Sequence, residues 1–174
     1  MKTIRKGGLT MEKRVSDSDI YFLREAISCA KRNPLHPYGA LITLDEKEVI
    51  YTSVNESHHN PLLHGEMSVL NKLFSGTYSS VSRNRLALYT TAEPCPMCAS
   101  AIYWANINKV VYGSSIPFLH NLFNRQITIR AKDIFDKTPS HYKIELIGSV
   151  LESECDELFM HSLTLKEDGR GAAT

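Results

Sequence analysis

The chain has 174 residues, of which 43% are apolar and 22% are charged, a composition typical of one globular domain rather than a disordered or fibrous protein. No apolar run approaches the roughly 20 residues that a membrane-spanning helix needs, so we expect no membrane segment. Lys and Arg number 20 against 19 Asp and Glu. Because nucleic-acid binding draws mainly on excess positive charge, a polynucleotide substrate is disfavoured.

Both ends of the chain are predicted to lie outside the folded domain, which we place at residues 16–165. Residues 1–15 are basic and lack the apolar stretch of a secretory signal, so we expect a cytoplasmic protein with an N-terminal tail. Residues 166–174 are polar or small and predict a mobile C-terminal tail. In a reducing compartment, Cys95 and Cys98 are expected to bind a metal rather than form disulfides.

Apolar periodicity alternates between helical and extended segments, which indicates an α/β layer fold. The expected elements are, in chain order, a helix capped by Asp17 or Ser18 and ending before Asn33-Pro34, strands over 38–43 and 48–53, a helix over 64–74, a strand over 86–90, a helix over 95–104, a strand over 109–112, a helix over 118–123, a strand over 142–147 and a helix over 151–163. The first two strands flank a charged turn and predict an antiparallel hairpin. Met67, Leu70 and Phe74 share one face of their helix. The rest of 114–140 is expected to be an ordered loop.

Three residues of the types that bind zinc stand at predicted helix starts. His64 opens the helix over 64–74, while Cys95 and Cys98 lie one helical turn apart at the start of the next helix. One histidine and two thiolates leave the fourth tetrahedral position of Zn²⁺ open for water, as in catalytic sites. Zinc acidifies bound water, and Glu66 is free to take the proton and pass it to a substrate.

Other interpretations of these residues remain open. Cys95 and Cys98 alone also fit a redox motif, and His58 or His59 would complete a purely structural zinc site. Glu66 alone fits a carboxylate that the helix dipole stabilises. The presence of a His-x-Glu motif beside a Cys-x-x-Cys motif favours the catalytic zinc site over these alternatives.

These motifs resemble those of the cytidine deaminase-like superfamily of zinc nucleobase and nucleoside deaminases. The likeness covers most of residues 17–115 and rests on four segments: Pro37-Tyr38-Gly39-Ala40, His64-Gly65-Glu66, the run from Leu88 to Cys98, and Val110-Val111-Tyr112-Gly113. The resemblance implies a three-layer α/β/α fold with a five-stranded mixed sheet, and commonly a homodimer. It also implies zinc on the histidine and the two cysteines, and Glu66 as a proton shuttle.

By the same resemblance, residues outside the zinc motif recognise the substrate. Backbone groups near Gly65 and Glu93 are expected to contact the edge of the base, and Asn55 to recognise it. Trp104 ends a helix similar to that of bacterial guanine deaminases, where the indole helps to shape the pocket, with packing in the core as the alternative. Gly65 itself is similar to the glycine of fungal-type cytosine deaminases.

We therefore expect hydrolytic removal of ammonia from a small nucleobase or nucleoside, with guanine or a related free base first and cytosine or cytidine next. Deamination of the wobble adenosine in tRNA is the alternative, but the acidic segment over 151–158 is unlike the basic final helix of those enzymes. A non-enzymatic, zinc-stabilised binding subunit comes last, because such a protein has no need of Glu66.

Overall fold

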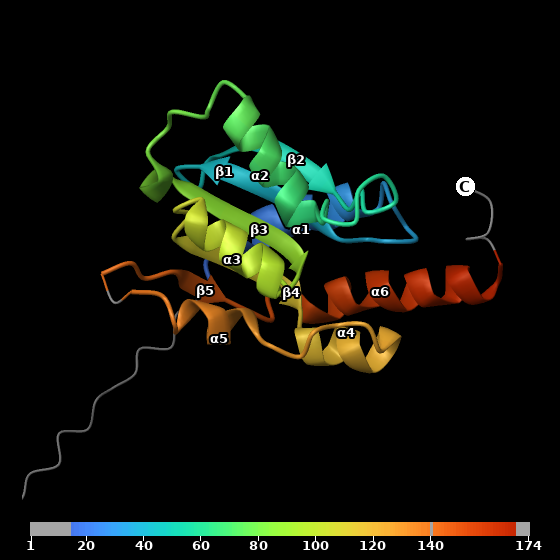
Figure 1. The fold of residues 1–174 in the computed structure, drawn as a ribbon. Helices are drawn as coiled ribbons and strands as arrows, with labels where there is room; N and C mark the ends of the chain where they lie inside the picture. The colour runs from blue at the N-terminus through green and yellow to red at the C-terminus, as the bar shows by residue number, and fades with distance from the viewer. Residues whose placement is uncertain (1–14, 140, 170–174) are drawn as a thin grey trace, which may run out of the picture.

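The computed structural model describes residues 15–139 and 141–169, so residues 1–14 and 170–174 of the two expected tails lie outside the described residues. The helices and strands are, in chain order, α1 (Asp17–Ala30), β1 (Gly39–Leu44), β2 (Glu48–Val54), α2 (Gly65–Ser75), a short 3-10 helix (Arg83–Arg85), β3 (Leu86–Ala92), α3 (Pro96–Trp104), β4 (Lys109–Ser114), α4 (Ile116–Phe123), α5 (Ala131–Phe135), β5 (Glu145–Ile147) and α6 (Glu152–Glu167) (Figure 1). Within the described residues, no helix is both long and apolar enough to cross a bilayer.

The five strands form one mixed sheet in the order β2-β1-β3-β4-β5. β1 pairs antiparallel with β2 and β3, so the predicted hairpin is confirmed, whereas β3, β4 and β5 run parallel to one another. Every residue of β3 is buried, as expected for a strand with neighbours on both edges and helices on both faces. The structure thus confirms the α/β class and the five-stranded mixed sheet.

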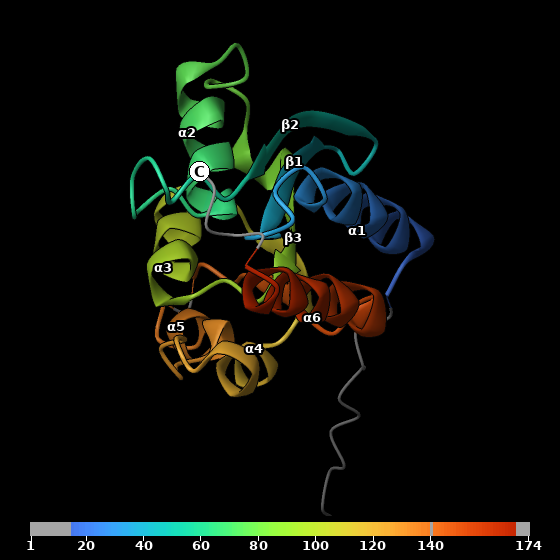
Figure 2. The ribbon, with the colours of Figure 1, turned by 90° about the vertical axis from the view of Figure 1, so that its right-hand side faces the viewer.

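Helices cover both faces of the sheet, because successive strand residues point to opposite sides. Leu41 of β1 packs into a cluster with α1 and Cys155 of α6, while its neighbours Ala40 and Ile42 pack into a second cluster with α2, α3 and α5. Figure 2 shows these two groups of helices on opposite sides of the strands. The expected three-layer arrangement is therefore present.

The first helix begins one residue earlier than predicted, because Ser16 rather than Asp17 or Ser18 caps it. Ser16 Oγ accepts the Asp19 N–H at 3.1 Å, and Asp19 Oδ2 accepts the Ser16 N–H at 3.0 Å. This reciprocal capping box satisfies two backbone donors that the helix itself leaves unpaired. It also fixes the carboxylate of Asp19, which is buried, beside the ammonium of Lys109 at 2.8 Å.

The buried face of α2 is only partly the face shared by Met67, Leu70 and Phe74. Val69, Leu70 and Leu73 are buried, whereas Phe74 is 51% exposed and carries the guanidinium of Arg83 over its ring at 4.9 Å. Apolar residues at 67, 70 and 74 and those at 69, 70 and 73 both fit helical spacing, so the spacing predicts the helix but does not determine which face is buried. Packing against the sheet determines which of the two faces of α2 is buried.

Two differences concern the C-terminal third. Residues 131–135 were expected in a loop but form α5, since burial of Ala131 and Phe135 in the α2–α3 cluster stabilises a short helix. α6 runs to Glu167 rather than to residue 163, so the tail boundary expected at 166 falls inside its last turn. Ser162 Oγ donates to the Leu35 carbonyl at 2.7 Å and holds this end of α6 against the domain.

Candidate active site

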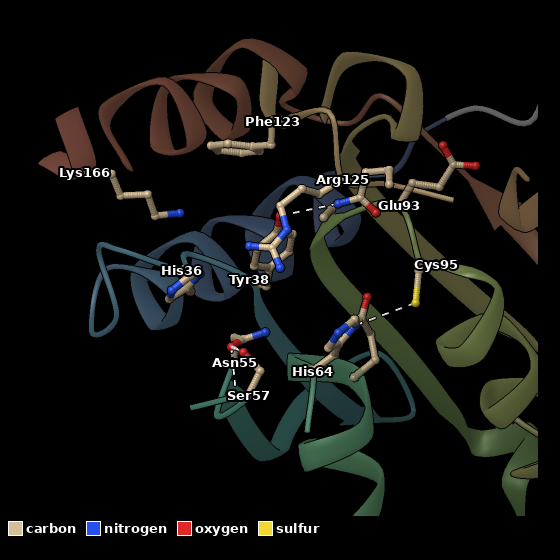
Figure 3. Close-up of a pocket in the computed structure, with 13 residues that line it drawn as sticks. His36, Tyr38, Asn55, Ser57, His64, Glu93, Cys95, Phe123, Arg125 and Lys166 are labelled. Carbon is tan, nitrogen blue, oxygen red and sulfur yellow. Dashed lines mark hydrogen bonds between the residues drawn. The ribbon is translucent and has the colours of Figure 1, made fainter. Parts of the chain in front are cut away.

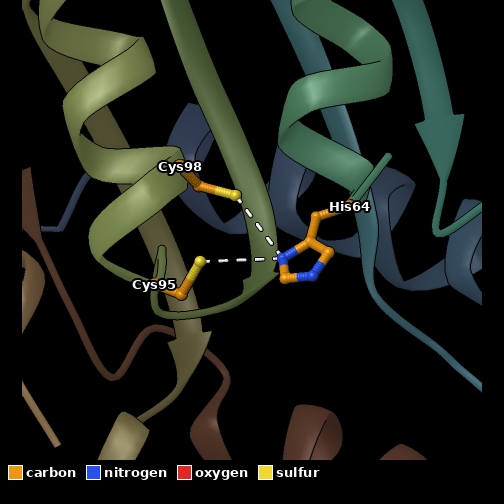
Figure 4. A group of neighbouring side chains, drawn as sticks. All are labelled: His64, Cys95 and Cys98. Atoms are coloured by element: carbon orange, nitrogen blue, oxygen red, sulfur yellow. Dashed lines mark hydrogen bonds between the residues drawn. The ribbon is translucent and has the colours of Figure 1, made fainter. Parts of the chain in front are cut away.

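The three zinc-type ligands predicted from the motifs lie together. His64 Nδ1 is 3.6 Å from Cys95 Sγ and 3.7 Å from Cys98 Sγ, and the three atoms all lie within 4.8 Å of one another (Figure 4). Zn–N and Zn–S bonds of about 2.1 and 2.3 Å at a tetrahedral angle separate the two donor atoms by about 3.6 Å. The donor set and its spacing therefore fit one zinc ion.

Local sequence explains why these ligands converge. His64 is the N-cap of α2 and Cys95 the N-cap of α3, with Pro96 at the first helical position, where its fixed φ favours a helix start. A Cβ on Gly65 would lie 2.5 Å from the carbonyl oxygen of Tyr38, so glycine lets the start of α2 approach β1 closely. Two helix N-termini, with their partial positive charge, thus point at the metal ligands.

The ligand group has no fourth member among the described residues, and this separates a catalytic from a structural zinc site. His58 and His59 are exposed, with their ring centroids 3.8 Å apart, and neither belongs to the ligand group. Cys95 and Cys98 share a histidine as a third neighbour, which a redox pair does not require. The geometry therefore favours the open zinc site.

Glu66 lies beside this group but is not part of it. The residue is 4% exposed, and its Oε1 accepts a hydrogen bond from Thr90 Oγ1 of β3 at 3.3 Å. Burial, followed by the charge of Cys95, raises the pKa of Glu66 above its usual range. A carboxylate at a helix start that serves the dipole alone is usually exposed, so burial beside a metal group indicates another role for Glu66.

A cavity of about 340 Å³ opens over the ligand group (Figure 3). Its inner part is lined by Asn55, Ser57, His64, Glu66 and Cys95. Its outer part is lined by His36, Tyr38, Phe123, Arg125, Gln126 and Lys166. Pockets of roughly 300–1,000 Å³ bind drug-sized ligands, so this space admits one small molecule.

Asn55 is buried in the wall of the cavity with its amide orientation fixed. Its Oδ1 accepts hydrogen bonds from the Ser57 N–H at 3.0 Å and from Ser57 Oγ at 2.7 Å. No partner is found for its Nδ2 group among the described residues, and in Figure 3 this nitrogen lies on the side that faces His64. Asn55 therefore presents a hydrogen-bond donor to the cavity.

Glu93 lines the cavity, but its carboxylate points away from it (Figure 3). Oε1 and Oε2 accept hydrogen bonds from the backbone N–H groups of Ala131 and Ile116, both at 2.9 Å, and from Arg130 Nε at 2.9 and 2.7 Å. The side chain is fully buried. It therefore ties the loop before Cys95 to the starts of α4 and α5, and leaves only its backbone for a ligand.

The structure does not place Trp104 in the cavity or in the core. Its side chain is 76% exposed at the end of α3 and makes an edge-to-face contact with Tyr103, with ring centroids 5.1 Å apart. At about 1.5 Å per residue, the nine residues of α3 carry its end about 13 Å from the ligands at its start. Gly65 likewise does not line the cavity but packs against β1.

The sequence motifs did not indicate the residues that line the outer part of the cavity. Phe123, Arg125 and Gln126 follow α4, and Lys166 belongs to the segment expected to be a tail. Tyr38 was considered only as part of a family motif, but it lines the cavity. Burial raises the pKa of its phenol to about 12. Only contacts between distant segments reveal these residues.

Comparison with known proteins identifies the family. Residues 16–114, more than half of the chain, match the cytidine and deoxycytidylate deaminase zinc-binding region. The chain therefore belongs to the cytidine and deoxycytidylate deaminase family. This deaminase is a hydrolase that acts on C–N bonds, and zinc is its metal, with His64, Cys95 and Cys98 able to hold the ion.

Curated relatives of this deaminase differ in substrate. It is 28% identical over 149 residues to a probable cytosine deaminase of Schizosaccharomyces pombe, covering 80% of this chain and 89% of the relative. It is 33% identical over 149 residues to the tRNA-specific adenosine deaminase of Buchnera aphidicola, covering 82% and 86%. A guanine deaminase structure from Nitrosomonas europaea shares the fold, with a TM-score of 0.71 at 16% identity over 93% of this chain and 97% of the other.

Proposed function

We propose that this deaminase hydrolyses an exocyclic amino group of a nucleobase ring, with Glu66 as the group that moves protons. The observation that carries the proposal is the buried Glu66 carboxylate, which lines the same cavity as the zinc-type ligands but does not join them. A general acid–base group must lie within reach of the reacting atoms without being consumed as a ligand. Glu66 meets both requirements.

The reaction requires three proton movements that one carboxylate can serve. A zinc ion on His64, Cys95 and Cys98 would acidify water. Glu66 accepts a proton from that water, whose oxygen bonds to the ring carbon that bears the amino group. It then donates the proton to the adjacent ring nitrogen. Finally it transfers the remaining proton of the added hydroxyl to the amino group, so that the C–N bond breaks, ammonia leaves and an oxo group remains.

In this proposal, Asn55 and backbone groups near Glu93 bind the base. The Asn55 amide is held by two hydrogen bonds from Ser57 and offers a donor to the cavity, which suits a carbonyl oxygen or ring nitrogen of a base. Gly65 contributes through the close approach of α2 to β1, and it positions His64 rather than the substrate.

The preference for guanine that we expected from Trp104 is not supported. The indole lies outside the cavity, and the likeness to a guanine deaminase structure extends to the fold alone at 16% identity. Relatives that act on cytosine and on tRNA adenosine are both similar in sequence. Guanine, cytosine and adenine rings are therefore candidates of equal standing.

A panel of substrates tests the proposal directly. Ammonia release is measured with cytosine, adenine and guanine, as free bases and as nucleosides, and with an anticodon stem-loop RNA. Glu66→Gln should keep its zinc and lose about 10²–10⁴-fold in kcat, since general acid–base catalysis contributes that much. Glu157→Gln, an exposed carboxylate on α6, is the matched control. Full activity of Glu66→Gln refutes the proton role.

We also propose a homodimer in a reducing compartment such as the cytoplasm. The large apolar side chains of Leu62, Phe74 and Trp104 are all more than half exposed in the single chain, and exposed apolar side chains of this kind are typical of the central part of a subunit interface. Cys29 and Cys155 are buried thiols, and no disulfide joins the described cysteines. Sedimentation equilibrium tests the assembly, because a mass of one chain at micromolar concentration contradicts it.

A further inference from the structure

We propose that the outer part of the cavity binds a phosphate group, so that the substrate of this deaminase is a nucleoside monophosphate. The phosphate would lie against Arg125 and Lys166, with His36 beside them, while the base reaches the zinc ligands. This inference rests on the proposed deamination and names its substrate class.

Three basic side chains from three separate segments line the mouth of the cavity. His36 follows α1, Arg125 follows α4, and Lys166 lies in the last turn of α6. In Figure 3, His36 and Lys166 lie on the side of the cavity away from Cys95, and Arg125 lies between them and the zinc ligands. Because the three segments are far apart in sequence, the cluster is a product of the fold rather than of a local run of charge.

The loop that carries Arg125 is held in place. Asn124 ends α4 in the left-handed conformation with φ 50°, and the His120 ring Nδ1 donates to the Gln126 carbonyl at 3.1 Å. Gln126 Nε2 in turn donates to the Tyr38 hydroxyl at 3.4 Å. These contacts turn the chain back toward the cavity on both sides of Arg125, so its direction is fixed by its neighbours.

Neither Arg125 nor Lys166 has an ion-pair partner among the described residues. By contrast, Arg24 pairs with Glu154, Lys109 with Asp19 and Glu46, and Arg130 with Glu93. Among the residues that the structure describes, the Lys166 ammonium lies over the Phe123 ring, with 4.9 Å to the ring centroid. Among the described residues, the outer part of the cavity is lined by two cations and by no carboxylate, in contrast to the inner part with Glu66, and such a wall is arranged for an anionic ligand.

These cations also repel one another. Partial burial, followed by the charge of Arg125, lowers the pKa of Lys166. Partial burial, followed by the charges of Lys166 and Arg125, lowers the pKa of His36. A phosphate monoester, with a charge of about −1.5 to −2 at pH 7 and three acceptor oxygens, would relieve this repulsion and accept hydrogen bonds from all three.

Overall charge and size favour a mononucleotide over a polynucleotide. The described residues carry 14 Lys and Arg against 18 Asp and Glu, so the basic mouth lies on an acidic body. A polynucleotide reader neutralises many phosphates with an extended basic surface, whereas this cluster matches one phosphate. The cavity of about 340 Å³ suits one small molecule with a base and a charged group.

Matched substrates test the inference. For cytosine, adenine and guanine, kcat/KM is measured with the nucleoside and with its 5′-monophosphate, and with a stem-loop RNA. The monophosphate of the preferred base should exceed its nucleoside by about 10-fold or more, as charge-assisted hydrogen bonds predict. The ratio should fall towards one in Arg125→Gln/Lys166→Gln. It should persist in Lys47→Gln/Lys137→Gln, which removes the same charge from exposed sites away from the cavity.

A binding measurement separates this inference from the deaminase function. Calorimetry on zinc-loaded Glu66→Gln compares the affinities for the same nucleosides and monophosphates without turnover. Deamination of nucleosides or bases with no gain from the phosphate, or activity on the stem-loop alone, overturns the phosphate site but leaves the deaminase. If no compound releases ammonia, the proposed function fails. Calorimetry then tests the phosphate site. Equal affinities for the nucleoside and its monophosphate overturn it, whereas a preference for the monophosphate that disappears in Arg125→Gln/Lys166→Gln supports it.

Discussion

Removal of the Glu93 carboxylate should destabilise the protein and loosen the outer wall of its cavity. In Glu93→Ala the N–H groups of Ile116 and Ala131, both residues being at most 1% exposed, lose their acceptor. Each buried donor left unsatisfied costs about 1–3 kcal/mol. Arg130 adds less, because its side chain is 40% exposed and water replaces its partner. The expected loss is about 3–4 kcal/mol, a large part of the 5–15 kcal/mol typical of a domain.

Urea unfolding of the zinc-loaded protein measures this loss. Glu157→Ala removes an exposed carboxylate and should change the free energy of unfolding by less than about 0.5 kcal/mol. Because Glu93 fixes the starts of α4 and α5, and Arg125 lies between them, KM in Glu93→Ala should rise more than kcat falls. A loss below about 1 kcal/mol would refute the argument that Glu93 is a structural clamp.

Three further changes test other parts of the structure. Cys98→Ala should lose zinc and some stability, because metal binding is linked to folding, and unchanged zinc by atomic absorption would show that Cys98 is not a ligand. Asp19→Asn should cost about 2–4 kcal/mol at pH 7. Burial alone would raise the pKa of Asp19, but Lys109 and Ser16 outweigh it and lower that pKa. The difference from the parent in urea unfolding should therefore shrink as the pH falls below the ordinary Asp pKa of about 3.9 and vanish once the pH is below the lowered pKa of Asp19, and a difference that does not shrink contradicts the argument. Trp104→Ala should leave kcat/KM unchanged, since the indole is 76% exposed, and a tenfold drop would mean that Trp104 contributes to a pocket.

Sequence reasoning succeeded where function depends on local geometry. His64 and the pair Cys95 and Cys98 stand at helix starts, so their spacing and caps predict where the side chains point without knowledge of the whole fold. The β1–β2 hairpin was predictable for the same reason, since its strands are joined by a short charged turn. Such features need only a few neighbouring residues to form.

Features that depend on distant contacts could not be predicted. Helical spacing alone allowed Phe74 to be buried, but the sheet selects another face of α2. The resemblance placed Trp104 in a pocket, but the length of α3 carries it away from the zinc ligands. Lys166 fitted the composition of a tail, yet the contacts of Ser162 and Phe159 hold α6 against the domain as far as this residue. Each outcome is decided by tertiary packing, to which periodicity and composition are insensitive.

The residues that line the cavity thus fall into two groups, those within the region that matches the family and those beyond it, and this division bears on substrate choice. The zinc ligands, Glu66 and Asn55 all lie within residues 16–114, the part of the chain that matches the family. Phe123, Arg125 and Lys166 lie beyond it. Proteins similar to this chain act, by their names, on cytosine and on tRNA adenosine, so the first group cannot by itself distinguish these substrates. We therefore expect the reaction to depend on the first group and the segments after β4 to contribute much of the selectivity.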